Sequence, residues 1–341
     1  MSHSKTRAEE IRRFILEQVE TNPANIVNQT EQTYDITRQT VNKHIRYLIN
    51  NNLLEAHGTT RNRHYLLKVL TEKSIDLLIT NGLEEDRVWR EEFASLIKEL
   101  PENALEIGYY GFTEMLNNAI DHSSGSQVTI TFKQTAVTTT ITMLDNGEGI
   151  FRKIQKAYHL EDERQAILEL SKGKLTTDPD NHTGQGIFFT SRMFDDFLIY
   201  SNGVFFSHNL HPSEEWITAG NRIESGTMIM MKLFNNTRRT DKAVFDQFAS
   251  EDDDYQFAKT IVPVRLARYG DEQLVSRSQA KRLMARMDCF QVVLLDFNAV
   301  ETIGQAFADQ IFRVFTRHHP DIKIVHINTN EAVMRMIKRA L

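Results

Sequence analysis

Two short glycine loops in the middle of the chain constrain its fold more than any other feature. The first, residues 145–150 (DNGEGI), follows directly on a strand pattern, TTTITMLD. The second, residues 184–187 (GQGI), leads into an apolar helix pattern. A glycine loop that opens a helix presents backbone N–H groups that suit a bound phosphate. Together the loops indicate an α/β domain with a nucleotide site.

A helix pattern upstream of both loops carries polar side chains on one face. In GFTEMLNNAIDHS, Glu114 and Asn118 are four residues apart, so both can point at one ligand, and Asp121 lies one turn further on. Mg²⁺ prefers oxygen ligands, and one amide or carboxylate often suffices when phosphates supply the rest. Hydrolysis would need a carboxylate that orients or deprotonates water. The helix therefore has the side chains that a magnesium–nucleotide site requires.

The three motifs, in this order, resemble those of the ATPase superfamily of gyrase B, MutL, the ninety-kilodalton chaperones and histidine kinases (GHKL), which share the Bergerat fold. The resemblance implies ATP and Mg²⁺ as ligands, Asn118 as the metal ligand and Glu114 as the catalytic residue. It also implies that Asp145 accepts a hydrogen bond from the adenine amino group and that Thr227 borders the base. The implied nucleotide-binding residues are Asn118, Asp121, Asp145, Gly147, Gly149, Ile150, Gly184, Gln185, Gly186, Ile187 and Thr227.

Roughly 30 residues between the two glycine loops correspond to the lid of this superfamily, which closes over bound nucleotide. Lys172 and Lys174 lie just inside its far end. They either reach the phosphates or are simply solvated. We expect His122 to cap its helix or to be solvated rather than to contact a phosphate.

The N-terminal segment, residues 1–70, has a different pattern and a different charge. Three helix patterns, the last of them RQTVNKHIRYLINN with Thr37 as its N-cap, precede two strand patterns around a turn. The segment holds ten Lys and Arg against seven Asp and Glu, a net charge of +3, whereas the whole chain has −6. This order of elements resembles a winged helix-turn-helix, which is an α+β fold. Such a module would place its third helix in a major groove of double-stranded DNA.

The outward face of the third helix is polar and basic, and so is the turn between the two strands. We expect these side chains to address base edges or phosphates. The alternative is a winged helix that serves only protein contacts or dimerisation. The candidate DNA-binding residues are Gln39, Asn42, Lys43, Arg46, Arg61 and Arg63.

The C-terminal segment, residues 255–341, alternates strand and helix patterns and resembles the STAS-like domains found downstream of such ATPases in bacteria. The serine that is phosphorylated in anti-sigma-factor antagonists is replaced here by Gln305 or Ala306 after Gly304, and the nearest hydroxyl, Thr302, is expected to be held in a strand. We therefore expect this domain to dock within the chain, to dimerise or to bind a protein partner, not to accept phosphate.

Composition indicates the cellular compartment in which we expect the chain. The sequence is 40% hydrophobic and 25% charged, and it has no run of about 18 apolar residues, so we expect a soluble protein that does not enter a membrane. The N-terminus is charged where a secretory signal would be apolar. The single cysteine, Cys289, fits a reducing cytoplasm and begins an apolar strand pattern, where we expect it to be buried.

These patterns predict a multidomain α/β chain: a winged helix (1–70), a connector (71–86), a Bergerat-fold α/β sandwich (87–240) and a small STAS-like α/β domain (255–341). We expect a homodimeric bacterial DNA-binding regulator that binds ATP, hydrolyses it slowly and couples nucleotide state to DNA binding or assembly. The alternatives are a serine/threonine kinase of the anti-sigma-factor type that acts on a separate STAS-type partner, and an ATP sensor without hydrolysis. A histidine kinase is disfavoured because residues 70–100 contain no histidine.

Overall fold

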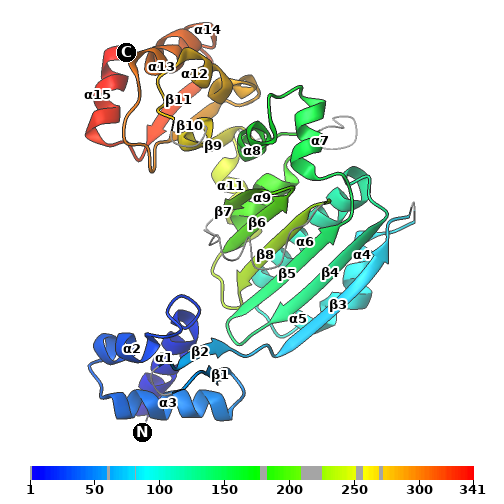
Figure 1. Cartoon of the computed structure of the whole chain (residues 1–341), viewed down its shortest axis with the longest axis vertical. Coiled ribbons are helices and arrows are strands. Elements are labelled where there is room, and N and C mark those ends of the chain that lie inside the picture. The colour runs from blue at the N-terminus through cyan, green and yellow to red at the C-terminus, as the bar shows by residue number, and fades with distance from the viewer. Residues whose placement is uncertain are drawn as a thin grey trace.

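The computed structural model describes residues 2–59, 62–80, 82–176, 183–208, 225–250, 256–268 and 272–341. An N-terminal domain, a central domain built on a six-stranded sheet and a C-terminal domain follow one another along the long axis (Figure 1). Among the described residues, no helix is long and apolar enough to cross a membrane.

The N-terminal domain consists of three helices and a two-stranded antiparallel hairpin. Its small core is separate from that of the rest of the chain and includes Ile15, Val41 and Ile45. The third helix begins after Thr37, whose side chain accepts a hydrogen bond from the backbone N–H of Thr40, as expected for an N-cap. The elements are α1 (Ser2–Gln18), α2 (Ile26–Tyr34), α3 (Arg38–Asn50), β1 (Leu54–His57) and β2 (His64–Leu67).

The central sheet has the order β3-β4-β5-β8-β6-β7, and all of its neighbouring strands are antiparallel. Because β8 lies between β5 and β6, the end of β5 meets the residues just before β8, and the Asp145 N–H donates to Thr227 O at 3.1 Å. Helices α6 (Glu102–His122) and α9 (Gly186–Met193) pack on one face of the sheet (Figure 1). The strands are β3 (Thr71–Leu78), β4 (Gln127–Gln134), β5 (Thr138–Asp145), β6 (Asp196–Ser201), β7 (Val204–His208) and β8 (Met228–Phe234).

Residues 71–78 differ from the connector that the sequence suggests, because they form edge strand β3 of the central sheet. Its side chains alternate between half-buried and exposed, which is sufficient for an edge strand. The half-buried Lys73 forms an ion pair with Glu92 at 2.6 Å. The segment is too polar to be recognised as a strand from apolar residues alone. It leads into short helical segments, α4 (Glu85–Val88), Trp89–Phe93 and α5 (Ala94–Ile97).

The C-terminal domain is a parallel three-stranded sheet of order β11-β10-β9 with helices packed on it, in the alternation that the sequence predicts. Two expectations differ. Cys289 is exposed, because it ends a single helical turn before β10 instead of entering the strand, and Thr302 lies in the loop before α13. The elements are β9 (Lys259–Pro263), α12 (Arg277–Met284), β10 (Val292–Asp296), α13 (Gln305–Ala308), α14 (Thr316–His318), β11 (Lys323–Ile327) and α15 (Glu331–Ala340).

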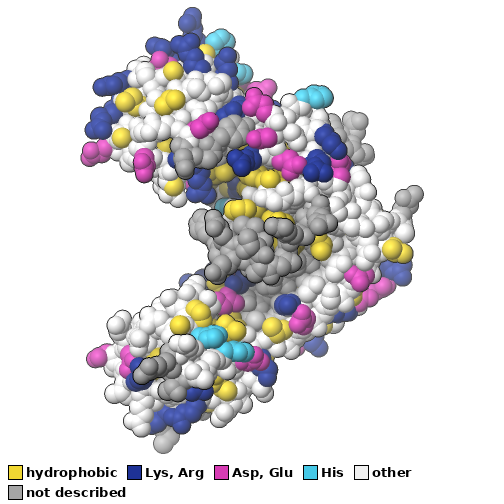
Figure 2. Space-filling model, viewed as in Figure 1, with side chains coloured by type: hydrophobic (Ala, Val, Ile, Leu, Met, Phe, Trp, Pro, Cys, Tyr) yellow, Lys and Arg dark blue, Asp and Glu magenta, His cyan; other side chains and the backbone are white. Residues whose placement is uncertain are grey.

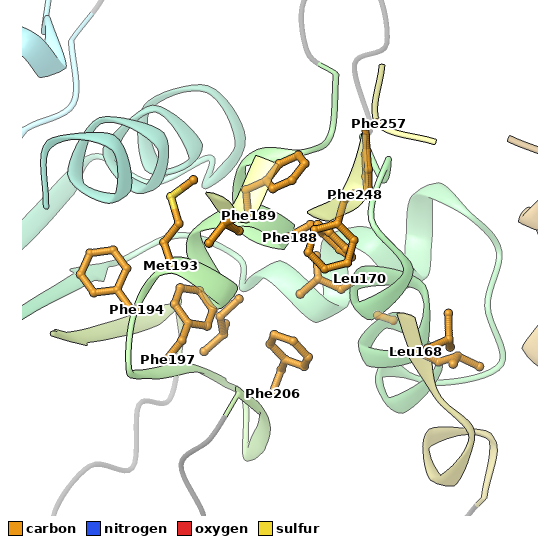
Figure 3. Close-up of a cluster of buried hydrophobic side chains, with 14 of the residues drawn as sticks. Leu168, Leu170, Phe188, Phe189, Met193, Phe194, Phe197, Phe206, Phe248 and Phe257 are labelled. Atoms are coloured by element: carbon orange, nitrogen blue, oxygen red, sulfur yellow. The ribbon is translucent and has the colours of Figure 1, made fainter. Parts of the chain in front are cut away.

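One hydrophobic core runs without a break through the central and C-terminal domains. At their junction Phe188 of α9 meets Phe257, which precedes β9, with ring centroids 4.6 Å apart. Phe248, at the end of α11 (Asp241–Phe248), packs against the same ring of Phe188 at 5.0 Å (Figure 3). The central domain also contributes α7 (Ile150–Ala157) and α8 (Glu163–Lys172) on this side of the molecule. The two domains therefore form one packed body.

Phe112 provides a test of the central core. It is fully buried in α6, with its ring centroid 5.1 Å from that of Trp89 and 5.2 Å from that of Phe93. Phe112→Ala should lower the free energy of unfolding by about 3–5 kcal/mol, because a large cavity replaces the ring. Leu78→Ala, at a side chain that is 70% exposed, should change it by less than about 0.5 kcal/mol. Urea unfolding followed by circular dichroism measures both, and equal effects would contradict the described packing.

Candidate functional site

A cavity of about 320 Å³ opens in the central domain among α6, α7, α9 and the ends of β5 and β8. It is within the size range of small-molecule sites. Nine of the residues proposed from the sequence line it, and they come from segments that are far apart in the chain. These nine are Glu114, Asn118, Asp145, Ile150, Gly184, Gln185, Gly186, Ile187 and Thr227.

Asp145 places a buried carboxylate at the wall of the cavity. Its Oδ1 accepts hydrogen bonds from the backbone N–H of Gly147 at 2.8 Å and of Thr227 at 3.2 Å. Burial raises the pKa of Asp145 above its ordinary value, and these two backbone donors oppose the rise. The hydroxyl of Thr227 accepts from the N–H of Ile150 at 3.0 Å, which fixes the start of α7. The first glycine loop and β8 therefore hold this carboxylate in one orientation.

Helix α6 brings its two motif side chains to the same cavity. Glu114 and Asn118 are both half-buried and both line it. Glu114 lies against the second glycine loop so closely that a Cβ atom on residue 186 would be 2.0 Å from Glu114 Oε2. A side chain at residue 186 would therefore force the Glu114 carboxylate to move, so the first and third motifs lie directly side by side. The adjoining Asn117 and His122, at the end of α6, also line the cavity.

The second glycine loop meets the cavity where α9 begins. Gly186 is the first residue of this helix, and Gln185, Gly186 and Ile187 line the cavity. The first N–H groups of a helix have no partner within the helix and carry partial positive charge. This end of the cavity is thus suited to the oxygens of a phosphate.

Three of the proposed nucleotide-binding residues do not line the cavity: Asp121, Gly147 and Gly149. Asp121 is exposed, because it is one turn further along α6 at the helix end. The N–H of Gly147 bonds to Asp145, and Gly149 is the N-cap of α7. These two glycines shape the loop that carries Asp145.

Lys153 lines the cavity and was not proposed from the sequence. It lies one turn into α7, and its Nζ donates to His122 O at 2.7 Å. Its place in the sequence could have indicated it, because it lies three residues after Ile150 on the helix that follows the first glycine loop. Thr176 and Thr183, from the ends of the lid, also line the cavity.

Lys172 and Lys174 are neither at the cavity nor solvated as the sequence suggested. Lys172 is buried and forms an ion pair with Glu169 at 2.6 Å, and Lys174 Nζ donates to Cys289 O at 2.8 Å. The reason is that α8 ends against the C-terminal domain, which both side chains face.

The donor set fits Mg²⁺ together with a polyphosphate. Within the described parts of the chain, no group of three or more His, Cys, Asp or Glu side chains could hold a metal ion alone. Mg²⁺ is commonly bound by one or two side chains plus substrate phosphates, and it accepts carboxylate and amide oxygens. Asn118 and Glu114 supply one amide and one carboxylate beside the phosphate-compatible end of the cavity.

The proposed DNA-contacting residues lie on the N-terminal domain. Gln39, Lys43 and Arg46 are exposed on α3 and Asn42 is half-buried there, while Arg63 is exposed in the turn before β2. Arg61 lies outside the described residues. Lysine and arginine side chains are visible on this domain and also on the C-terminal domain (Figure 2). Among the described ion pairs, none involves Lys43, Arg46 or Arg63.

Comparison with known proteins identifies two of the three domains. Residues 80–204 match the family model of the histidine kinase-like ATPase domain. Residues 279–334 match the model of a STAS-like domain of unknown function. No curated protein matches the chain. The first match contains the motifs at Glu114, Asp145 and Gly186, and it indicates an ATP-binding function of the GHKL ATPase or kinase type. The central domain is accordingly called the ATPase-like domain, and the C-terminal domain is called the STAS-like domain.

Asp145→Asn tests the buried carboxylate in two ways. It should weaken ATP binding about 100-fold, because an amide N–H₂ replaces an acceptor oxygen in a buried site. It should also stabilise the free protein at neutral pH. The folded-state pKa of Asp145 is raised, so the stability that this group contributes is full below its ordinary pKa of 3.8 and is lost as the pH rises through the folded value.

The advantage of the variant over the wild type in thermal unfolding should therefore grow as the pH rises above 3.8 towards the raised folded-state pKa of Asp145. Isothermal titration measures the affinity, with Asp76→Asn on the exposed side of β3 as the control. Equal ATP affinities of wild type and Asp145→Asn would contradict the assignment.

Proposed function

We propose that this chain is an ATP-dependent DNA-binding regulator, in which binding and slow hydrolysis of Mg²⁺–ATP set the affinity for DNA or the state of assembly. One observation carries the nucleotide part. Glu114 and Asn118 of α6, Asp145 at the end of β5 and the start of α9 come from three segments and converge on one cavity. Each group would have a different role. Glu114 would activate water, Asn118 would bind the metal, Asp145 would recognise the base, and the start of α9 would bind phosphate.

Each residue of the site would have its own role in nucleotide binding or hydrolysis. Asp145, held by Gly147 and Thr227, accepts from the adenine amino group. Asn118 holds the metal, which neutralises phosphate charge when it is bound. Glu114 orients the attacking water and takes its proton. Lys153 is placed to add positive charge to the same cavity.

Glu114→Gln separates binding from hydrolysis. The amide keeps the size of the side chain and cannot take a proton, so phosphate release should fall by about 100-fold or more while ATP affinity changes little. Glu106→Gln, at an exposed position two turns earlier on α6, is the matched control. A phosphate-release assay beside isothermal titration gives both quantities, and undiminished release by Glu114→Gln would remove this residue from the mechanism.

The same incubation with γ-labelled ATP distinguishes the alternatives. Free phosphate supports an ATPase, whereas bound nucleotide without product supports a sensor. Label on an added STAS-type protein would support the kinase. Label on the chain itself is not expected, because Gln305 begins α13 where an acceptor serine would stand, and it has no hydroxyl.

Contacts between the N-terminal and ATPase-like domains support a link between nucleotide and DNA. Glu20, just beyond α1, forms an ion pair with Lys232 of β8, and Glu17 accepts from Asn236 at 3.4 Å. Strand β8 starts directly after Thr227, which bonds to the loop of Asp145. A change at the adenine pocket thus has a short path to the N-terminal domain, along β8 and across the ion pair between Lys232 and Glu20.

DNA binding is tested by removing two exposed cations from α3. Lys43→Ala with Arg46→Ala should weaken binding to duplex DNA and reduce the slope of log affinity against log salt by about 2, because two phosphate contacts are lost. Lys98→Ala with Lys242→Ala removes two exposed cations from the ATPase-like domain as the control. Fluorescence anisotropy over a range of salt, with and without ATP, measures the effect. An unchanged salt slope would favour a domain used only for protein contacts.

A further inference from the structure

Lys172 carries a buried charge outside the cavity, since its residue is only 1% exposed. Its Nζ has three partners: Glu169 Oε1 at 2.6 Å, Arg282 O at 3.1 Å and Ala285 O at 2.9 Å. Glu169 is on the same helix, α8, but both carbonyls belong to the end of α12 in the STAS-like domain. The backbone of Lys172 is tied to that domain too, since its carbonyl accepts from the Thr260 hydroxyl of β9 at 2.7 Å.

Arg286 of the STAS-like domain completes this cluster. One of its nitrogens, Nη1, bonds to the other oxygen of Glu169 at 3.2 Å, and Nη2 donates to Lys174 O at 2.7 Å. Its guanidinium also lies 5.0 Å from the ring of Tyr158, whose hydroxyl donates to Thr176 O at 2.5 Å. Arg286 therefore contacts α8, the backbone after it and the aromatic side chain that holds Thr176.

The segment fixed in this way is the wall of the nucleotide cavity. Leu175 and Thr176 line the cavity, and the N–H of Leu175 donates to Gly184 O at 3.2 Å. Gly184 has a φ of +68°, and a Cβ there would lie 2.5 Å from the backbone of Leu175, so the two ends of the lid are pressed together. Two residues after Gly184, α9 begins at the phosphate end of the cavity.

The cluster is satisfied only while the STAS-like domain is docked. Lys172 and Glu169 are both buried, and moving the domain away would remove two carbonyls and the guanidinium that compensate them. A buried charge that loses its partners is strongly destabilising. Burial lowers the pKa of Lys172 and Glu169 opposes that change, as expected for a charge that depends on its neighbours.

We propose that Arg286 of the STAS-like domain is a positioning residue for the nucleotide site: through Glu169 and Lys174 it holds residues 172–176 against Gly184, so that the docked domain favours retention of the nucleotide phosphates. The inference rests on the proposed ATP binding. Because coupling between binding events is reciprocal, ATP then favours the docked STAS-like domain by the same factor. The STAS-like domain thereby strengthens the binding of the nucleotide phosphates and does not affect the binding of the base.

Titration of the full-length chain with ATP and with adenosine tests this proposal. Arg286→Ala should weaken ATP binding about tenfold, within the usual range of coupling between sites, and leave adenosine affinity unchanged. Arg286→Lys, which keeps a charge for Glu169 and loses the second donor, should fall between Arg286→Ala and wild type. Lys281→Ala, an exposed cation of α12, should behave as wild type.

Hydrogen exchange of the nucleotide-free chain gives a second measurement. The amides of residues 173–176 should exchange faster in Arg286→Ala, and those of β4 in the distant sheet should not. Equal losses of ATP and adenosine affinity, unchanged ATP affinity or unchanged exchange would each overturn the proposal. If wild type binds neither ATP nor adenosine, the proposed function itself fails, which is a distinct result.

Discussion

The bonds around the carboxylate of Asp145 are the constraint on which the central domain depends. A buried carboxylate is costly unless it is hydrogen-bonded, and here the donors come from two parts of the chain, the loop at Gly147 and the start of β8 at Thr227. These bonds thus hold the start of β8 beside the end of β5, which are the two central strands of the sheet. The sheet then carries α6 and α9 on one face, and the cavity forms between them. Site and fold are therefore specified by the same contacts.

Local patterns in the sequence were sufficient for the parts of the site that depend on short spacings. The offset of four between Glu114 and Asn118 requires only a helix, and the glycines at 184 and 186 require only a turn before one. These residues do lie around a single cavity. The pairing of Glu114 with Gly186 could not be derived from spacing, because the two segments are 72 residues apart and meet only through packing on the sheet.

The expectations that failed concern a domain junction and an edge strand. Lys172 is the last residue of α8, and only the presence of the carbonyls at the end of α12 makes burial of its charge possible. Cys289 lies one turn short of the apolar strand to which it was assigned. In β3 the alternation was present in TEKSIDLL, but half of its inward positions are polar, and Lys73 is accommodated there by Glu92. Apolar periodicity is thus a poor guide to edge strands and domain junctions.

The continuous core between Phe188 and Phe257 has a consequence for how the chain can be divided. The two family matches are separated in the sequence, since one ends at residue 204 and the other begins at residue 279. Phe188 of the first match and Phe257, which precedes β9, nevertheless share one interior, so the gap between the matches is not a boundary between folding units. A fragment that ends before residue 256 would leave Phe188, Phe189 and Phe248 without the ring of Phe257 and expose an apolar face prone to self-association. The ATPase-like and STAS-like domains therefore complete one interior, and we expect them to unfold together.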